Sequence, residues 1–344
     1  MPTSAKPPSS KVVLGLTIRQ KNGENLKKVN IIIPVYNKGK YLDRCLKSIL
    51  KQKGNFLLNV IIVDDGSMDN SVEIASKYTE LYDNYELIIN DHKGVSEARN
   101  TGLKNASGDF VLFVDADDSI NKDYVSTLVN AYEENDVDLV VSGLVKKTNN
   151  NIVCGKIQLN YQNLSLKKNG YIKFFNDKSL FEIVYTRLFN LNIIKQHNIT
   201  FKDQQFGEDT LFMMEYLKYV DNVLLLSYIG YNNYIIGQTL SRRRLNNVWE
   251  ETVIMADKSN DYFHDNYGRV WHYLYLRSIK LTLLNNMRSY ASFKKICEKI
   301  TTDWRFSNIK ISKFFKTKDK IFTYCLKHRL FYLIYSKYKI MTKE

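Results

Sequence analysis

The stretch GDFVLFVDADDS, Gly108–Ser119, decides the fold class because an apolar run leads directly into a group of aspartates. The five apolar residues from Phe110 to Val114 are typical of a strand that is buried on both faces of a parallel sheet. Such a strand carries the residues that follow it to the carboxyl edge of the sheet, where open α/β sheets bind their ligands. The sequence therefore predicts that Asp115, Asp117 and Asp118 lie at a ligand-binding edge.

These three carboxylates need partners if they are to stay ionised at such an edge. Crowded acidic groups repel one another and lose hydration, and a divalent metal ion would compensate both effects. Aspartates also commonly follow strands as turn and helix-capping residues, so Asp118 and Ser119 could simply begin the next helix. From this stretch alone, both the metal site and the structural turn stay open.

Outward from this stretch, strands and helices alternate along the first part of the chain. Apolar runs predict strands over residues 29–34, 57–64 and 85–91, and apolar periodicity predicts helices over residues 41–52, 71–81 and 94–105. This alternation indicates βαβ units and a mostly parallel sheet with helices on both faces. Residues Asn37, Asp64 and Asp65 would then share the carboxyl edge with Asp115.

The pattern becomes less regular after residue 142. Residues 149–168 are polar and predict a crossover into a second lobe, and the segments 183–196 and 207–220 predict helices. A strand and turn follow from residue 223, and the chain is expected to be helical from about residue 245 to its end.

Length and composition restrict the class of protein. A chain of 344 residues with 44% hydrophobic and 25% charged residues is expected to fold as two domains, or as one domain with an appendage. Its four cysteines are widely spaced, which favours neither a disulfide framework nor a zinc site and suits a reducing, cytoplasmic compartment. Residues 1–28 are expected to form a flexible leader and not a signal peptide, and no run is apolar enough for a transmembrane helix.

Four segments, in this order, resemble the family 2 glycosyltransferases of the GT-A fold: IIIPVYNKGKYLDRCLKSIL, VIIVDDGSMDNS, GVSEARNTGLKNASGDFVLFVDADD and GEDTLF. The resemblance implies a Rossmann-like catalytic domain over residues 29–240, with a nucleotide-binding half (29–145) and an acceptor half (146–240), followed by a helical region over 245–344. It also implies a metal-dependent, inverting transfer of a sugar from a nucleoside diphosphate, most simply UDP. The acceptor would be a sugar hydroxyl of a bacterial surface polysaccharide or lipid-linked oligosaccharide.

The resemblance assigns roles to residues at the matching positions. The metal ligands would be Asp117, Asp115 and Asp118, and the metal would be Mn²⁺ or Mg²⁺, since hard oxygen ligands favour hard cations. The nucleotide would be bound by Pro34, Val35, Tyr36, Asp65, Arg99 and Asp115. His92 falls near the same edge, and we interpret it as structural.

An inverting transfer needs a base that accepts the proton of the incoming hydroxyl. By the same resemblance, Asp209 would be this base, and Glu208 would bind the acceptor or exchange roles with it. The free amides and dipole of a helix N-terminus would keep Asp209 ionised, although a plain helix cap would occupy the same position. Three further residues, Gln238, Ser241 and Arg242, match the family's diphosphate-binding region only loosely, because the spacing differs.

The charge of the chain indicates an anionic partner. The net charge is +14, and much of the excess lies in residues 310–344, where basic and aromatic residues alternate. This composition fits a pair of helices lying on an anionic bilayer, at the inner face of the plasma membrane. Nucleic acid could bind such a stretch, but a lipid-carried acceptor favours the membrane. An ordinary helix pair with a solvated basic face is the structural alternative.

Two other functions fit the sequence less well than sugar transfer does. A noncatalytic nucleotide- or carbohydrate-binding module on the same fold is disfavoured because Asp115, Asp117 and Asp209 are all present. An aspartyl phosphotransferase would have threonine or valine where Ser119 stands, and it would leave Asp65 and Asp209 unexplained.

Overall fold

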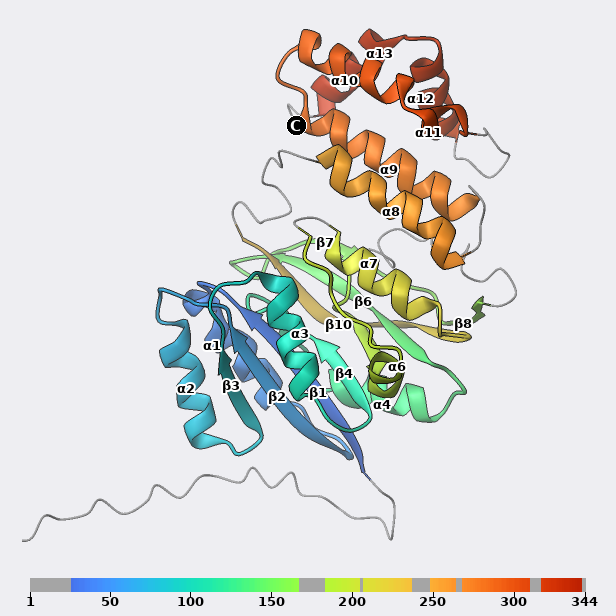
Figure 1. Cartoon of the computed structure of the whole chain (residues 1–344). Coiled ribbons are helices and arrows are strands. Elements are labelled where there is room, and N and C mark those ends of the chain that lie inside the picture. The colour runs from blue at the N-terminus through green and yellow to red at the C-terminus, as the bar shows by residue number, and fades with distance from the viewer. Residues whose placement is uncertain are drawn as a thin grey trace, which may run out of the picture. The chain divides into compact units, whose positions relative to one another are not determined.

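The computed structural model describes residues 26–166, 183–204, 207–236, 248–263, 268–309 and 317–341. The chain divides into two compact units (Figure 1). The first comprises residues 1–204 and 208–239, and the second comprises residues 205–207 and 240–344.

The first unit is built around a ten-stranded mixed sheet, in which the strand order is β3-β2-β1-β4-β9-β6-β10-β5, with β7 paired to β6 and β8 paired to β10. The parallel half contains β1 (Lys27–Val35), β2 (Phe56–Asp64), β3 (Tyr85–Ile89) and β4 (Phe110–Phe113). The other half contains β5 (Ser119–Ile120), β6 (Leu139–Thr148), β7 (Val153–Ile157), β8 (Gln162–Ser165), β9 (Arg187–Asn190) and β10 (Asn222–Ile235). Strand β9 joins the halves because it pairs antiparallel with both β4 and β6.

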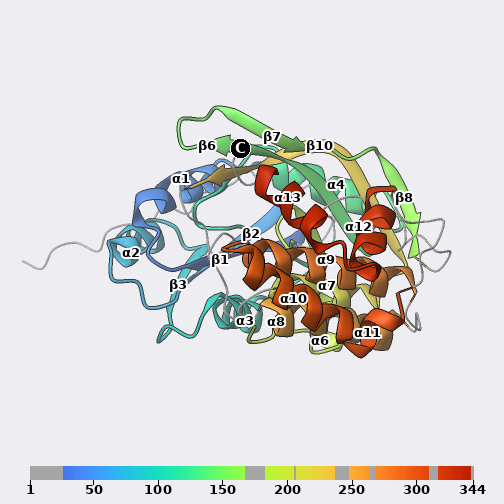
Figure 2. The ribbon, with the colours of Figure 1, turned by 90° about the horizontal axis from the view of Figure 1, so that it is seen from above.

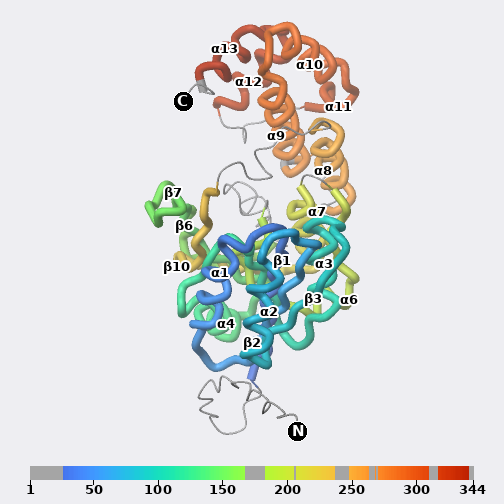
Figure 3. The backbone as a smooth tube through the Cα atoms, turned by 90° about the vertical axis from the view of Figure 1, so that its left-hand side faces the viewer, coloured from blue at the N-terminus to red at the C-terminus, as the bar shows by residue number. Residues whose placement is uncertain are grey.

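Helices cover both faces of this sheet. They are α1 (Gly39–Leu50), α2 (Ser71–Leu81), α3 (Val95–Asn105), α4 (Tyr124–Glu133), α6 (Leu191–Gln196) and α7 (Glu208–Leu217). Figure 3 shows α1 and α4 on one side of the strands and α3 and α6 on the other. The odd-numbered residues of β1, such as Ile31 and Ile33, pack in the core with α1, while Ile32 lies against Gly102 of α3. Both faces of β1 are therefore buried, which explains its unbroken apolar sequence.

Most of the predicted elements are confirmed. The helix predicted over 71–81 is α2, and the apolar run before the aspartates is the fully buried strand β4. Two residues of α3 serve packing: the Asn100 amide exchanges two hydrogen bonds with the backbone of Phe201, and Gly102 lies against Ile32.

Two predictions are wrong. The segment 183–196 is not one helix, because residues 187–190 form the central strand β9 and the helix α6 begins only at Leu191. The segment 149–168, for which the sequence predicted only a polar crossover into a second lobe, contains the strands β7 and β8. Both errors have the same cause, since a strand of four or five residues is too short to be distinguished from a helix by periodicity.

The second unit is helical throughout its described residues, as predicted. Its helices are α8 (Val248–Phe263), α9 (Arg269–Asn285), α10 (Tyr290–Thr302), α11 (Trp304–Ser307), α12 (Thr317–Lys327) and α13 (Phe331–Met341). The Trp271 ring stacks on Tyr275 within α9, and Phe293 of α10 packs against Tyr335 of α13. Figure 2 shows the helices of this unit in orange and red. None of the described helices combines the length and apolarity that spanning a bilayer requires.

Candidate active site

The loops after three neighbouring strands meet at one edge of the sheet. Because β1 is parallel to both β2 and β4, their carboxyl ends lie together and are followed by Asn37, Asp65 and Asp115 respectively. The amide of Asp65 donates to the carbonyl of Val35, which ties two of these loops together. The edge predicted from the sequence therefore exists.

The Arg99 cluster consists of the Arg99 guanidinium and the three carboxylates that it contacts. Arg99 Nη1 lies 2.7 Å from Asp209 Oδ1 and 3.4 Å from Glu208 Oε1, and Nη2 lies 3.5 Å from Asp115 Oδ1. The guanidinium comes from α3, Asp115 follows β4, and the other two carboxylates begin α7. Buried Arg99 thus brings the predicted base and a predicted nucleotide ligand to one point.

The electrostatics of the cluster bring two of its carboxylates close to neutral pH. Burial raises the pKa of Asp115 to about 6, with Arg99 opposing the shift and Asp117 adding to it. Burial likewise raises the pKa of Asp209 to about 6, with Arg99 opposing and Glu208 adding. Carboxylates with such pKa values can exchange protons near pH 7, which is the property required of a general base.

Asp117 is held from two sides at the same edge. The Lys38 ammonium, in the loop after β1, forms an ion pair with the Asp117 carboxylate. Arg44 Nη2 donates to the Asp117 carbonyl at 2.6 Å, while its guanidinium lies 3.5 Å from the centre of the Tyr234 ring. The sequence analysis did not identify Lys38 or Arg44, although a basic residue directly after the first strand was a usable signal.

Asp118 has different surroundings from its two neighbours. Its side chain is fully buried, and it accepts hydrogen bonds from the Tyr234 amide at 2.8 Å and from Asn233 Nδ2 at 3.1 Å. Burial raises the pKa of this carboxyl well above its ordinary value. These contacts attach the aspartate loop, residues 115–118, to β10. They occupy both oxygens of the Asp118 carboxylate.

The residues that could hold a metal ion are Asp115 and Asp117. In the part of the chain that the structure describes, no three His, Cys, Asp or Glu side chains are arranged as a complete metal site. Magnesium-type ions are commonly bound by one or two carboxylates together with substrate phosphates, so two hard oxygen ligands fit an ion that arrives with a diphosphate. The Lys38 ammonium shows that this position attracts a cation.

The segments predicted to bind the nucleotide form a second group of contacts. The Tyr36 ring, 38% exposed, stacks on the His92 ring with centroids 4.1 Å apart. Asp65 is buried, and its two oxygens accept hydrogen bonds from the amides of Lys93 and Gly94 at 2.8 Å. Val35 is buried beneath this group, and Pro34 is half-buried. Asp65 therefore shapes the loop that presents His92 beside Tyr36.

A buried arginine that the sequence analysis missed lies behind the cluster. Arg187 in β9 is fully buried, and its Nη1 donates to the Tyr185 carbonyl at 2.7 Å. Its Nε and Nη2 have no partner among the described residues. Burial lowers the pKa of Arg187 to about 10, and the charge of Asp209 opposes this shift. Because the segment was predicted as a helix, the position of this side chain could not be inferred from the sequence.

The loosely matching residues Gln238, Ser241 and Arg242 lie outside the described residues.

Comparison with known proteins identifies the first unit. Residues 30–197 match the model of the family "Glycosyl transferase family 2". The glycosyltransferase GlyA of Streptococcus pneumoniae is 43% identical over 114 residues, which cover 33% of this chain and 16% of that protein. The matched segments span no more than 58% of the length of the first curated relatives.

Solved structures show the same fold. The chain superposes on residues 1–349 of TarS, the poly(ribitol-phosphate) beta-N-acetylglucosaminyltransferase of Staphylococcus aureus, in complex with UDP-GlcNAc, with a TM-score of 0.59, 22% identity, and coverage of 81% of this chain and 91% of that one. It superposes on a mannosyltransferase of Pyrobaculum calidifontis in complex with GDP-Man and Mn²⁺ with a TM-score of 0.53, 15% identity, and coverage of 93% and 89%. The expected GT-A fold is thereby confirmed.

Replacing Arg99 tests whether it holds the cluster together. Arg99→Met leaves three carboxylates without their shared cation, so the free energy of unfolding should fall by about 3–5 kcal/mol at pH 8. The loss should shrink at pH 5, because Asp115 and Asp209 have pKa values of about 6 and become neutral there. Urea unfolding at both pH values measures this, with Lys104→Met on the exposed side of α3 as the control. A loss that does not depend on pH would contradict the shared-charge interpretation.

Proposed function

Because the chain belongs to the family 2 glycosyltransferases, we propose that it moves a sugar from a UDP-sugar to a hydroxyl group of a saccharide acceptor. The observation that carries this proposal is the Arg99 cluster, which joins Asp115, at the nucleotide edge of the sheet, to the carboxylates that begin α7. The residues proposed to bind the donor and the acceptor thus contact the same buried guanidinium, that of Arg99.

The donor side of the proposal rests on the edge formed by Tyr36, Asp65 and His92. The exposed faces of the stacked Tyr36 and His92 rings offer a planar aromatic surface for a nucleobase. UDP is the proposed nucleotide because the fold is shared with a protein solved in complex with UDP-GlcNAc. Arg99 is buried against three carboxylates. We therefore propose that it positions these carboxylates and does not contact the diphosphate directly.

The proposed metal ligands are Asp115 and Asp117, and the metal is Mn²⁺ or Mg²⁺. When bound, such an ion neutralises the charge that develops on the leaving diphosphate. The fold is shared with a mannosyltransferase solved with Mn²⁺, which supports the same ion here. Asp118 is proposed to position the loop, since its oxygens are already engaged with β10. Lys38 would release Asp117 when the ion and the diphosphate enter.

The proposed base is Asp209. As the acceptor oxygen forms its bond to the anomeric carbon, the bond from that carbon to the diphosphate breaks and UDP leaves with the electron pair. The hydroxyl proton passes to the Asp209 carboxylate, whose pKa of about 6 leaves it mainly ionised at pH 7 and yet basic enough to accept the proton. Attack from the face opposite the diphosphate inverts the anomeric configuration. Glu208 is proposed to orient the acceptor hydroxyl.

The proposed acceptor is a bacterial surface polysaccharide or a lipid-linked oligosaccharide. TarS, which shares the fold, is named for transfer to poly(ribitol-phosphate), and this supports a polymeric acceptor. We further propose that the protein works at the inner face of the plasma membrane, where a lipid-linked acceptor would be found. No role for nucleic acid is proposed.

The membrane proposal rests on the outer side of the last two described helices. Tyr335 of α13 is buried against Tyr290 and Phe293 of α10, so one side of α13 belongs to the core of the second unit. Leu333 and Ile340 of the same helix are exposed at 58% and 66%. Exposed apolar side chains between lysines are the composition of a surface-bound helix on an anionic bilayer.

Metal binding should respond in opposite directions to two substitutions. Asp117→Ala removes a ligand and should abolish Mn²⁺-dependent binding of UDP, whereas Lys38→Met removes a competing cation and should tighten Mn²⁺ binding about 3- to 5-fold. Calorimetric titration of MnCl₂ in the presence of UDP measures both, and Lys40→Met is the matched control on the exposed side of α1. Unchanged affinity in the Asp117 variant would contradict the metal assignment.

Asp209→Asn should retain UDP binding but lower sugar transfer at least ~10²-fold, the scale for losing a general base. The wild-type rate should rise with pH through about 6, because Asp209 must lose its proton to act, and this rise should disappear in the variant. UDP release from UDP-GlcNAc with a panel of saccharide acceptors measures the rate. If Glu208→Gln lost the rate and Asp209→Asn kept it, Glu208 would be the base.

The double substitution Leu333→Ser and Ile340→Ser should weaken binding to vesicles that contain anionic lipid at least ~10-fold, because burying each side chain contributes about 1.5–3 kcal/mol. Cosedimentation at low and at high salt separates this apolar contribution from charge attraction, which salt screens. Ile152→Ser, whose side chain is 63% exposed in the first unit, is the control. Full-length protein that ignores anionic vesicles at low salt would contradict the membrane proposal.

A further inference from the structure

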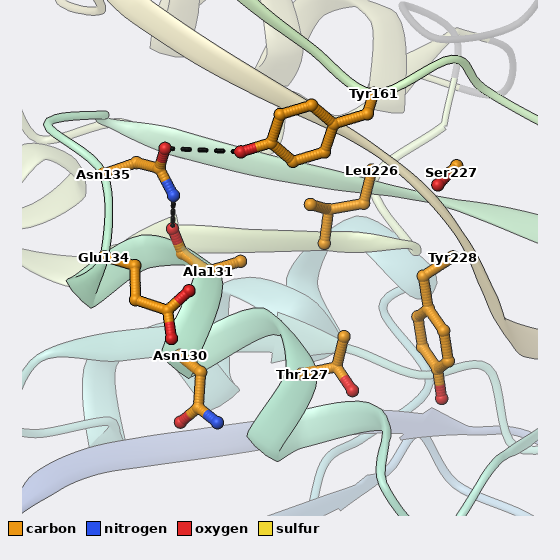
Figure 4. Close-up of a pocket in the computed structure, with 9 residues that line it drawn as sticks. All are labelled: Thr127, Asn130, Ala131, Glu134, Asn135, Tyr161, Leu226, Ser227 and Tyr228. Atoms are coloured by element: carbon orange, nitrogen blue, oxygen red, sulfur yellow. Dashed lines mark hydrogen bonds between the residues drawn. The ribbon is translucent and has the colours of Figure 1, made fainter.

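We propose that the first unit has a second saccharide-binding site, apart from the Arg99 cluster, in a cavity between α4 and the strand β10 (Figure 4). The cavity has a volume of about 340 Å³, near the lower end of the range for small-molecule sites. Its size suits one or two sugar rings. The identification of the ligand as part of the acceptor rests on the proposed function, whereas the chemistry of the cavity stands by itself.

The residues that line the cavity exclude other classes of ligand. None of the nine lining residues is Lys, Arg or His, and one, Glu134, is acidic, so a phosphate, a nucleotide or another anion would find no counter-charge there. The aliphatic lining is limited to Ala131 and Leu226, which is too little to bury a lipid chain. The other lining residues are two tyrosines and small polar residues. This lining suits a neutral ligand that is rich in hydroxyl groups.

The aromatic and polar groups of the cavity are held in place before any ligand binds. The Tyr228 hydroxyl donates to Asp123 Oδ1 at 2.7 Å, and its ring stacks on Tyr124. Asn135 Nδ2 donates to the Ala131 carbonyl at 2.8 Å, which leaves its Oδ1 directed at the Tyr161 hydroxyl, 3.5 Å away. Groups that are already ordered lose little entropy on binding, which favours affinity.

The arrangement in Figure 4 matches the two kinds of surface that a sugar presents. A pyranose ring has an apolar C–H face and a rim of hydroxyl groups. The Tyr161 side chain is 62% exposed and offers a flat amphipathic surface for the C–H face. Asn130 of α4 and Glu134, the residue that follows the last residue of this helix, offer amide and carboxylate groups for the hydroxyl rim.

The cavity shares a strand with the candidate active site. Tyr228 lines the cavity, and Tyr231 of the same strand β10 accepts a hydrogen bond from the Asp115 amide at 3.1 Å. Tyr124 lies between them, with its ring 6.4 Å from Tyr228 and 6.3 Å from Tyr231. A saccharide in the cavity would therefore be attached to the same strand that supports the aspartate loop, as expected for an acceptor that extends over several sugars.

The test uses an array of neutral glucose, galactose, mannose and N-acetylhexosamine oligosaccharides, probed with the full chain in the presence of UDP and MnCl₂. At least one oligosaccharide should bind, and Tyr161→Ala or Asn130→Ala should weaken its binding at least ~10-fold. Both residues are exposed, so these substitutions leave the core intact. Tyr332→Ala, with a side chain that is 63% exposed in the second unit, is the matched control and should bind as the wild type does.

The inference is overturned if no oligosaccharide binds, or if binding survives unchanged in both cavity variants, which would place the sugar at the active site alone. Calorimetry with UDP on the same samples separates this failure from a failure of the proposed function. Normal UDP binding without saccharide binding overturns the second site only. Saccharide binding that depends on Tyr161, in a protein that does not bind UDP, supports the second site and overturns the donor proposal.

Discussion

One buried guanidinium, that of Arg99, compensates carboxylates that come from segments about a hundred residues apart. Three negative charges in a partly buried site would repel one another, and a single cation cannot neutralise all of them. Burial raises the pKa values of Asp115 and Asp209 to about 6, and the neighbouring carboxylates add to this rise. A site with this imbalance is prepared to take up positive charge, either a proton or a metal ion. Its chemistry therefore follows from the same contact that joins α3 to α7.

The rest of the first unit supports this contact. Parallel pairing of β1 with β2 and β4 brings three loops to one edge, and β9 connects that half of the sheet to β6 and β10. Strand β10 holds the aspartate loop through two hydrogen bonds. The Tyr231 hydroxyl accepts one from the Asp115 amide, and the Tyr234 amide donates the other to the Asp118 carboxylate. These contacts use the backbone of the loop and the Asp118 side chain, which leaves the Asp115 and Asp117 carboxylates available for charged partners.

The sequence predicted the parallel half of the fold well, because strands buried on both faces give unbroken apolar runs and the helices between them have clear periodicity. It also predicted that Asp115 and Asp209 share a site, although only through resemblance, since no local pattern links residues so far apart. Three features could not be predicted from the sequence. The central strand β9 is too short to show a period, and the partner of Asp117 depends on where the Lys38 side chain points. The inward direction of Asp118 depends on β10, which follows it by about a hundred residues.

The central claim is that Asp115 and Asp117, beside the Arg99 cluster, receive the metal ion and the diphosphate of the donor. A crystal structure of the protein with UDP-GlcNAc and MnCl₂, with diffraction data collected at the manganese absorption edge, tests this claim most directly. The account predicts an anomalous peak within about 2.5 Å of an Asp117 carboxylate oxygen, a diphosphate oxygen on the same ion, and a Lys38 ammonium that has moved away from Asp117. A nucleotide bound at this edge with no manganese at Asp117, or bound elsewhere on the protein, would contradict it.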